Sequence, residues 1–317
     1  MAPTEMILVT EYDLIPGFPI PADIFIHLPT EGWILVARKG SKSSLQDLHV
    51  TQTQEGAAFF IKRTEYLQVV DQNVRVANVM LRRPEVSILR KSEFLGKALD
   101  SVLRELREIG VQPSLAEKAT LLAKSLIEVV RTGEELRQVL EVIEAQQSHF
   151  LKDSIAVASI SVMMGRMIGW PSSSLEILAL GGYLSNVGYA ELPAELLNKS
   201  PSQMSMQELA KWQKHPQLGN ELISKLKAFP SEIALIILEH HENSAGTGFP
   251  LQKKESTLHQ FSKVVALAAA FADLTLQSPH NPTPMNASEA VHHIERKLQV
   301  PYNASCWLAL KRSLDLK

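Results

Sequence analysis

The chain has 317 residues, of which 45% are hydrophobic and 21% charged, and its formal net charge is −2. This length supports one large hydrophobic core and a smaller second domain. The near-neutral charge gives no electrostatic reason to expect nucleic acid or an anionic membrane as a partner. Because Cys306 is the only cysteine, an intrachain disulfide and a cysteine-rich zinc site are both excluded.

Targeting signals and apolar runs predict a cytoplasmic protein. The first residues, MAPTEMILVTEYDL, include early acidic side chains and no basic stretch before an apolar one, unlike a signal peptide. The longest apolar run, Val264–Ala272, is too short to span a bilayer. A single cysteine is typical of the reducing cytosol.

The first part of the chain is expected to form a small α+β domain over residues 1–75. Three short runs, at 23–27, 32–38 and 56–62, are rich in β-branched and aromatic residues and are bounded by Pro or Gly, as strands are. The segment 43–54 between the last two runs is compatible with a short helix. We therefore predict an α+β N-terminal module.

From about Lys91 the pattern becomes helical, after a linker that we place at 76–90. Leucines recur at helical spacing, for example at Leu95, Leu99 and Leu103. Prolines then separate the long helical stretches up to the C-terminus. The range 91–317 is therefore expected to be an all-α helical bundle.

An adjacent histidine pair, His240 and His241, ends an apolar run. Neighbouring residues of a helix point about 100° apart, so both rings reach one site only at a corner or between two metal ions. For an isolated pair the ordinary arrangement is one ring in the core and one in solvent. Nothing around the second pair, His292 and His293, indicates a site.

The residues that follow the first pair favour a site. The segment 240–250, HHENSAGTGFP, resembles the HHExxDGxGYP signature of HD-GYP domains, with Ala245 in place of the Asp and Phe249 in place of the Tyr. Segments 178–197, 214–219 and 263–280 resemble further elements of that family at matching spacing. The resemblance implies an HD-type helical bundle, the fold of metal-dependent phosphodiesterases that act on the bacterial second messenger cyclic di-GMP.

Most of the chemistry-bearing family positions are replaced, so the resemblance implies a degenerate member without catalytic residues. The eponymous His-Asp pair falls at Ser185 and Asn186, and Asn keeps the shape of Asp without its charge. The lysine of the HDxGK element falls at Tyr189, and the distal ligand Asp falls at Ala269. Asp273 is one residue out of register with the next family Asp and is expected to point about 100° away.

Three histidines keep their family positions: His215, His240 and His241. His149 and Asp153, spaced i, i+4 on one helix face, correspond to a family carboxylate and histidine with the two residue types exchanged. These five residues could hold a single iron, manganese or zinc ion. An ordinary exposed pair explains His149 and Asp153 as well, so we expect no cofactor and keep the single ion as the alternative.

The loop after the histidines keeps the glycines of the family signature. Its residues are Gly246, Thr247, Gly248, Phe249 and Pro250. A glycine-rich loop with an aromatic residue and a proline makes a shaped, exposed turn. A binding role and a purely structural turn explain these residues equally well.

Three functions compete. The first is a non-catalytic signalling protein of cyclic di-GMP pathways that binds another protein, such as a diguanylate cyclase or a paralogue, or binds cyclic di-GMP itself. The second is a residual metal-dependent cyclic di-GMP phosphodiesterase with a rearranged metal site. In the third, the N-terminal domain carries the function and the bundle serves as a scaffold for a homodimer. The missing ligands favour the first.

Overall fold

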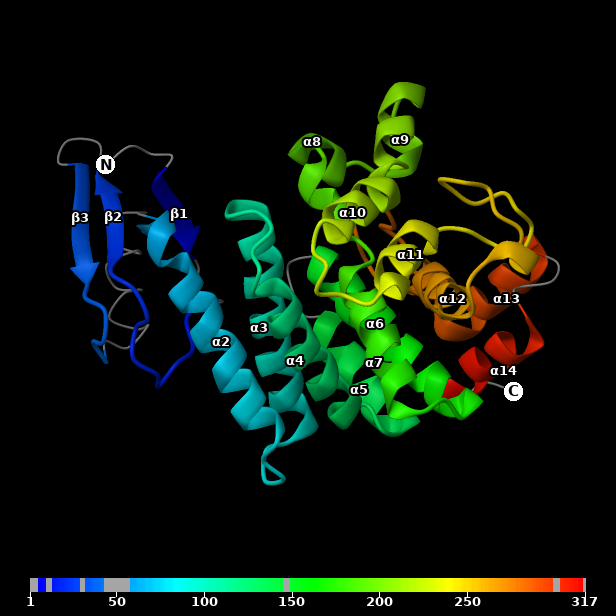
Figure 1. Ribbon diagram of the computed structural model, residues 1–317, viewed down its shortest axis with the longest axis horizontal. Helices are drawn as coiled ribbons and strands as arrows, with labels where there is room; N and C mark the ends of the chain where they lie inside the picture. Colours follow the sequence, from blue (N-terminus) through cyan, green and yellow to red (C-terminus); the bar gives the residue numbers. More distant parts are fainter. Residues whose placement is uncertain are drawn as a thin grey trace.

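The computed structural model describes residues 5–9, 13–28, 32–42, 58–144, 149–298 and 303–315. It has a small antiparallel sheet near the N-terminus followed by a helical bundle (Figure 1), which confirms the predicted fold class. The short helix expected at 43–54 lies outside the described residues.

The sheet has four strands in the order β1-β4-β2-β3, and every neighbouring pair is antiparallel. Strands β3 and β4 lie within two of the predicted runs and β2 overlaps the third, ending one residue later, whereas β1 was not predicted. Along β4 buried and half-buried residues alternate, as expected for a strand with one face on the core. The strand bounds are Met6–Val9, Ile24–Leu28, Gly32–Ala37 and Phe59–Lys62.

Helix α2 (Tyr66–Leu81) lies between the sheet and α3 (Ile88–Glu108) (Figure 1). Within the range 76–90 that we assigned to a linker, residues 76–81 belong to α2 and residues 88–90 to α3, so the connection is confined to 82–87. The sheet, α2 and the bundle share one continuous hydrophobic cluster.

Buried polar interactions also connect the N-terminal segment to α3. Arg104 of α3 forms an ion pair with the buried Asp13 and donates to the carbonyl of Leu8 at 2.6 Å. Asn73 of α2 donates to the Ser101 hydroxyl at 2.6 Å and to the Asp13 carbonyl at 3.0 Å. These bonds satisfy groups that would be costly to bury alone, and they fix α2, α3 and the N-terminal segment together.

Helix α6 (His149–Ile168) is the centre of the bundle, and every residue from 154 to 165 is buried. A helix that is buried all round has neighbours on every side, here α5, α7, α12 and α14. The remaining bounds are α4 Leu115–Val129, α5 Gly133–Glu144, α7 Ser172–Leu184, α8 Ala194–Leu197, α9 Met206–Trp212, α10 His215–Ser224, α11 Ser231–Glu239, α12 Gln260–Thr275, α13 Ala287–Leu298 and α14 Ala304–Ser313.

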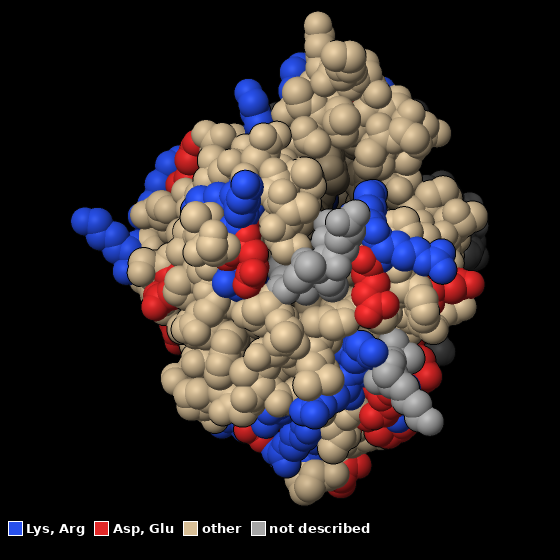
Figure 2. All heavy atoms as spheres, turned by 90° about the vertical axis from the view of Figure 1, so that its right-hand side faces the viewer, with Lys and Arg blue, Asp and Glu red and all other residues tan. Residues whose placement is uncertain are grey.

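The surface carries charges of both signs. On the face shown in Figure 2, Lys and Arg side chains lie close to Asp and Glu side chains across a largely uncharged surface, in keeping with the near-neutral net charge. Among the described residues, no helix is both long enough and apolar enough to cross a bilayer.

Candidate metal centre

Three histidines meet where α10, α11 and the turn after α11 come together. His215 begins α10, His240 directly follows the last residue of α11, and His241 comes next. His215 and His240 are almost completely buried. The His215 ring donates from Nδ1 to the Trp212 carbonyl at 2.9 Å, and the His240 ring donates from Nδ1 to the Ile237 carbonyl at 2.7 Å. Each of these two rings therefore keeps its lone pair on Nε2.

The free nitrogens of this histidine cluster (His215, His240, His241) face one another. The Nε2 atoms of His215 and His240 are 3.2 Å apart, and one ring nitrogen from each of the three residues lies within 4.8 Å of the others. Two facing lone pairs repel unless a cation lies between them. The buried Nε2 of His241 has no hydrogen-bond partner among the described residues.

This geometry fits one metal ion. At a metal–nitrogen distance of about 2.1 Å, two ligands at a tetrahedral angle are about 3.4 Å apart, close to the observed separation. Bonds from Nδ1 to backbone carbonyls are the usual way in which ligand histidines are oriented. Burial lowers the pKa of all three rings, that of His240 to about 4, so the neutral, metal-binding form is present at pH 7.

The two other predicted ligands, His149 and Asp153, are not members of the histidine cluster. Among the described residues, the group with metal-binding spacing contains only His215, His240 and His241. Asp153 accepts a hydrogen bond from the Asn186 amide, and burial together with the charge of Asp273 raises the pKa of Asp153. His149 packs against His280 with ring centroids 5.6 Å apart. The structure therefore brings three of the five predicted residues together.

Asp273 is a residue that sequence reasoning misplaced. Its Oδ2 lies 3.9 Å from the Nδ1 of His241, so it faces the histidine cluster instead of pointing away from it. The reason is helical spacing, because Asp273 follows Ala269 by four residues and shares its face of α12. His293 is a second correction, since it lines a cavity of about 310 Å³ together with His241 and Asp273.

The replaced family positions are filled by packing groups. The Tyr189 ring lies 4.2 Å from the His215 ring, centroid to centroid, and is buried. The Ser185 hydroxyl donates to the Gly182 carbonyl one turn earlier at 3.0 Å, and Ala269 is buried. None of these three side chains can bring a negative charge to a metal ion at neutral pH.

The loop at 246–250 is fastened to the histidines. Phe249 stacks on His241 with ring centroids 4.5 Å apart. A Cβ on Gly248 would lie 2.4 Å from the His241 carbonyl oxygen, so only glycine fits there. The buried Glu242 carboxylate accepts from the backbone N–H groups of Leu251 at 2.6 Å and Lys253 at 2.8 Å. These contacts support the structural interpretation of the loop, and its exposed Thr247 remains accessible.

The fold and the histidine cluster define a helical domain of the HD type. A family model described as an HD domain matches residues 137–305, more than half of the chain. The protein therefore belongs to the HD domain family. A solved chain described as an HDG"Y"P protein from Bdellovibrio bacteriovorus shares the fold, with a TM-score of 0.69 over 98% of this chain and 99% of that one at 18% identity.

Curated relatives include enzymes of cyclic dinucleotide turnover. This chain is 22% identical over 197 residues to a cyclic di-GMP phosphodiesterase of Pseudomonas aeruginosa, covering 62% of this chain and 47% of the relative. It is 28% identical over 182 residues to the cyclic di-GMP phosphodiesterase response regulator RpfG of Xanthomonas campestris, covering 56% and 47%. A Thermotoga maritima cyclic di-GMP phosphodiesterase is 24% identical over 209 residues, covering 63% and 56%. The chain thus spans about half the length of these relatives.

Proposed function

We propose that this protein is a receptor in cyclic di-GMP signalling that holds a single divalent metal ion and binds the dinucleotide without hydrolysing it. The observation that carries the proposal is the bond from the Asn186 amide to Asp153. At the position where the resembling family has a metal-bridging Asp, an amide instead occupies an oxygen of the neighbouring Asp153 carboxylate. A second metal ion would therefore lack the bridging carboxylate at this position.

The single metal ion of this proposal would be held by the histidine cluster, with Asp273 beside His241. A bound divalent ion supplies a Lewis acid for a phosphoryl oxygen. The backbone bonds of His215 and His240 keep both Nε2 atoms aimed at one point, and the neutral rings contribute no charge of their own. The Tyr189 ring closes one side of this point by packing on His215. These residues bind and orient a phosphate, and they offer no second metal to activate water.

One observation favours a second function, a residual phosphodiesterase. The Asp273 carboxylate faces the histidine cluster at 3.9 Å from His241 and lies close enough to Asp153 to raise its pKa. A carboxylate beside a metal-bound phosphate can act as a general base. Slow hydrolysis by a single-metal site would require this residue.

The protein-binding form of the receptor hypothesis uses the loop at 246–250. Its exposed Thr247 and the half-exposed Leu251 that follows the loop form the part that a partner could reach. A diguanylate cyclase, a paralogue or a second copy of this chain are the partners that we propose. Because Phe249 stacks on His241, metal binding at the histidine cluster would alter the surface that such a partner contacts.

The test is metal content together with hydrolysis, on untagged protein reconstituted with iron(II), manganese(II) or zinc(II) and freed of excess ion. We expect about one equivalent of metal in the wild type and in the control His292→Ala, whose ring is exposed on α13. The variant His240→Ala should lose the bound metal. We also expect cyclic di-GMP to bind and remain intact over hours.

Three results would contradict the proposal. Two bound metal ions with turnover that is lost in His240→Ala would establish a working phosphodiesterase. Turnover with one ion that is lost in Asp273→Asn would instead establish the residual single-metal enzyme. Metal content below a tenth of an equivalent for all three ions would remove the metal from the proposal.

A further inference from the structure

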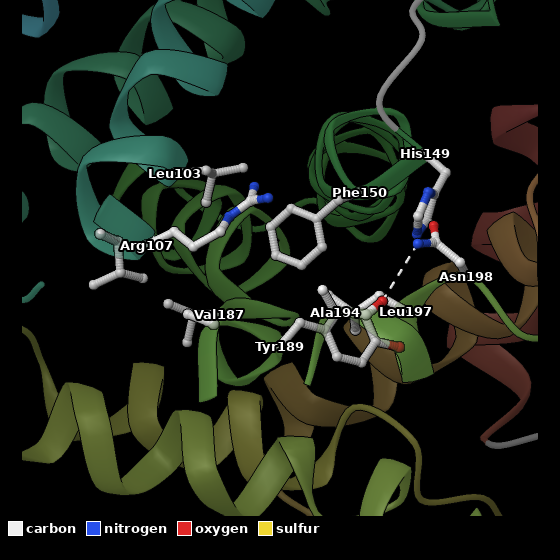
Figure 3. A pocket seen from close by; sticks show the side chains of 11 residues that line it. Leu103, Arg107, His149, Phe150, Val187, Tyr189, Ala194, Leu197 and Asn198 are labelled. Atoms are coloured by element: carbon white, nitrogen blue, oxygen red, sulfur yellow. Dashed lines mark hydrogen bonds between the residues drawn. The ribbon is translucent and has the colours of Figure 1, made fainter. Parts of the chain in front are cut away.

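A second cavity lies beside the histidine cluster, between α3 and the N-terminal end of α6. We call it the α3 pocket, and Arg107, Phe150, Tyr189, Ala194 and Asn198 are among the residues that line it (Figure 3). Its volume is about 170 Å³. Because Tyr189 both lines the α3 pocket and packs on His215, one aromatic ring connects the pocket with the metal centre.

The α3 pocket has a single charged lining residue among those that the structure describes. Arg107 is exposed and lies over the face of Phe150, with its guanidinium carbon 6.0 Å from the ring centroid. Its charge acts on Asp100 of the same helix, but among the described residues it has no hydrogen bond or close ion pair. Burial lowers the pKa of His149, which also lines the pocket, to about 4, so this ring is neutral at pH 7. A guanidinium that donates no hydrogen bond within the described residues, in a pocket without a lining carboxylate, favours an anionic ligand group.

The remaining walls favour a planar ring. Phe150 and Tyr189 have centroids 5.5 Å apart, and Leu103 and Val187 add apolar surface. Pockets for whole drug-sized ligands measure about 300–1,000 Å³, so this cavity has room for one ring system and not for an entire dinucleotide. Asn198 adds an amide, whose nitrogen donates to the Ala194 carbonyl at 3.3 Å and whose oxygen is a hydrogen-bond acceptor (Figure 3).

We propose that the α3 pocket binds the base of one guanine nucleotide unit of cyclic di-GMP, with Arg107 paired to the adjoining phosphate. Bases stack on aromatic rings and on guanidinium planes, and arginine forms bidentate bonds to phosphate. This inference rests on the proposed function for the identity of the dinucleotide. It adds that α3, which precedes the HD match at 137–305, supplies the residue that recognises the ligand.

The test is calorimetric titration of the full chain with cyclic di-GMP, GMP and ribose 5-phosphate. The variants are Arg107→Met, which removes the charge, and Ala194→Trp, which fills the cavity. Arg90→Met is the matched control, because Arg90 lies on the same helix, is exposed and is paired with Glu93 outside the pocket. Circular dichroism and melting temperature verify that each variant is folded.

We expect Arg107→Met and Ala194→Trp to weaken cyclic di-GMP binding at least tenfold, with Arg90→Met unchanged. GMP should bind at least tenfold more tightly than ribose 5-phosphate, because the base carries the stacking. Cyclic di-GMP binding that is equal in all variants would refute the α3 pocket and leave the proposed function intact. GMP binding that depends on Arg107, without any cyclic di-GMP binding, would support the pocket and refute the proposed function. Absence of binding by all three probes would refute both.

Discussion

Replacing Asn186 by Asp restores the family residue and tests directly whether the amide keeps a second metal away. Asn186 is 5% exposed and its amide donates to the Asp153 carboxylate. In Asn186→Asp this bond disappears and two carboxylates face each other in a largely buried place. Without metal the native state should therefore lose stability.

The magnitude follows from the two interactions. A hydrogen bond to a charged group contributes about 1.5–3 kcal/mol. Two like charges about 4 Å apart repel by about 4 kcal/mol at an effective dielectric constant of 20. Because burial and the charge of Asp273 already raise the pKa of Asp153, one carboxyl takes up a proton before this repulsion is complete, so we expect a total loss of about 3–5 kcal/mol. A divalent cation between the carboxylates reverses the repulsion and should restore most of the loss.

The assay is urea unfolding at pH 7.5, once with EDTA and once with manganese(II), alongside the metal content of the folded variant. Asn198→Asp is the control, since Asn198 is exposed and the same change there should alter the free energy of unfolding by less than about 0.5 kcal/mol. An Asn186→Asp variant as stable as the wild type in EDTA, or one that gains no stability from manganese, would refute the role given to Asn186.

Three further predictions concern packing and pH. Lys118→Met should lower the free energy of unfolding by about 3–5 kcal/mol in urea unfolding, because the buried Glu105 loses the partner that lies 2.7 Å from it. The double variant Lys118→Met with Glu105→Leu should recover most of that loss. Gly248→Ala should cost about 1–3 kcal/mol and lower metal retention, since the new Cβ meets the His241 carbonyl; unchanged retention would separate the loop from the site. Burial raises the pKa of Asp100 from 3.8 to about 6, so the native state binds the extra proton and stability should fall as pH rises through this range; Asp100→Asn should flatten that slope.

The fold class was predictable because strand-like and helix-like patterns occupy separate parts of the chain. The bounds of the individual helices and strands were less predictable, and helix α2 is the clearest case. Its buried face includes Val69, Val70, Val74 and Val76, which are β-branched and weak helix formers, so burial between the sheet and α3 decides its conformation. Strand β1 has four residues and pairs with β4 fifty or more positions later, a contact that no local pattern reveals.

The histidines of the candidate site were predictable from their motif, whereas the carboxylates were not. Asp153 has suitable spacing from His149, but spacing does not reveal that the Asn186 amide competes for its oxygen. We compared Asp273 with the family Asp that falls at position 272 and therefore expected it to point away. Its spacing of four residues from Ala269, the position of the distal ligand Asp, places it on the same helix face. The α3 pocket was missed because its Arg107 belongs to a helix without a motif.

The bonds from Glu242 to the loop have a thermodynamic consequence. Glu242 directly follows His241 and accepts from two backbone N–H groups beyond Pro250, while Phe249 stacks on the His241 ring. These contacts link the position of the loop to the position of the His241 ring. By reciprocity, any factor by which metal at the histidines changes the affinity of a partner for the loop equals the factor by which that partner changes the affinity for metal. A measurement at either end would thus report the coupling at both.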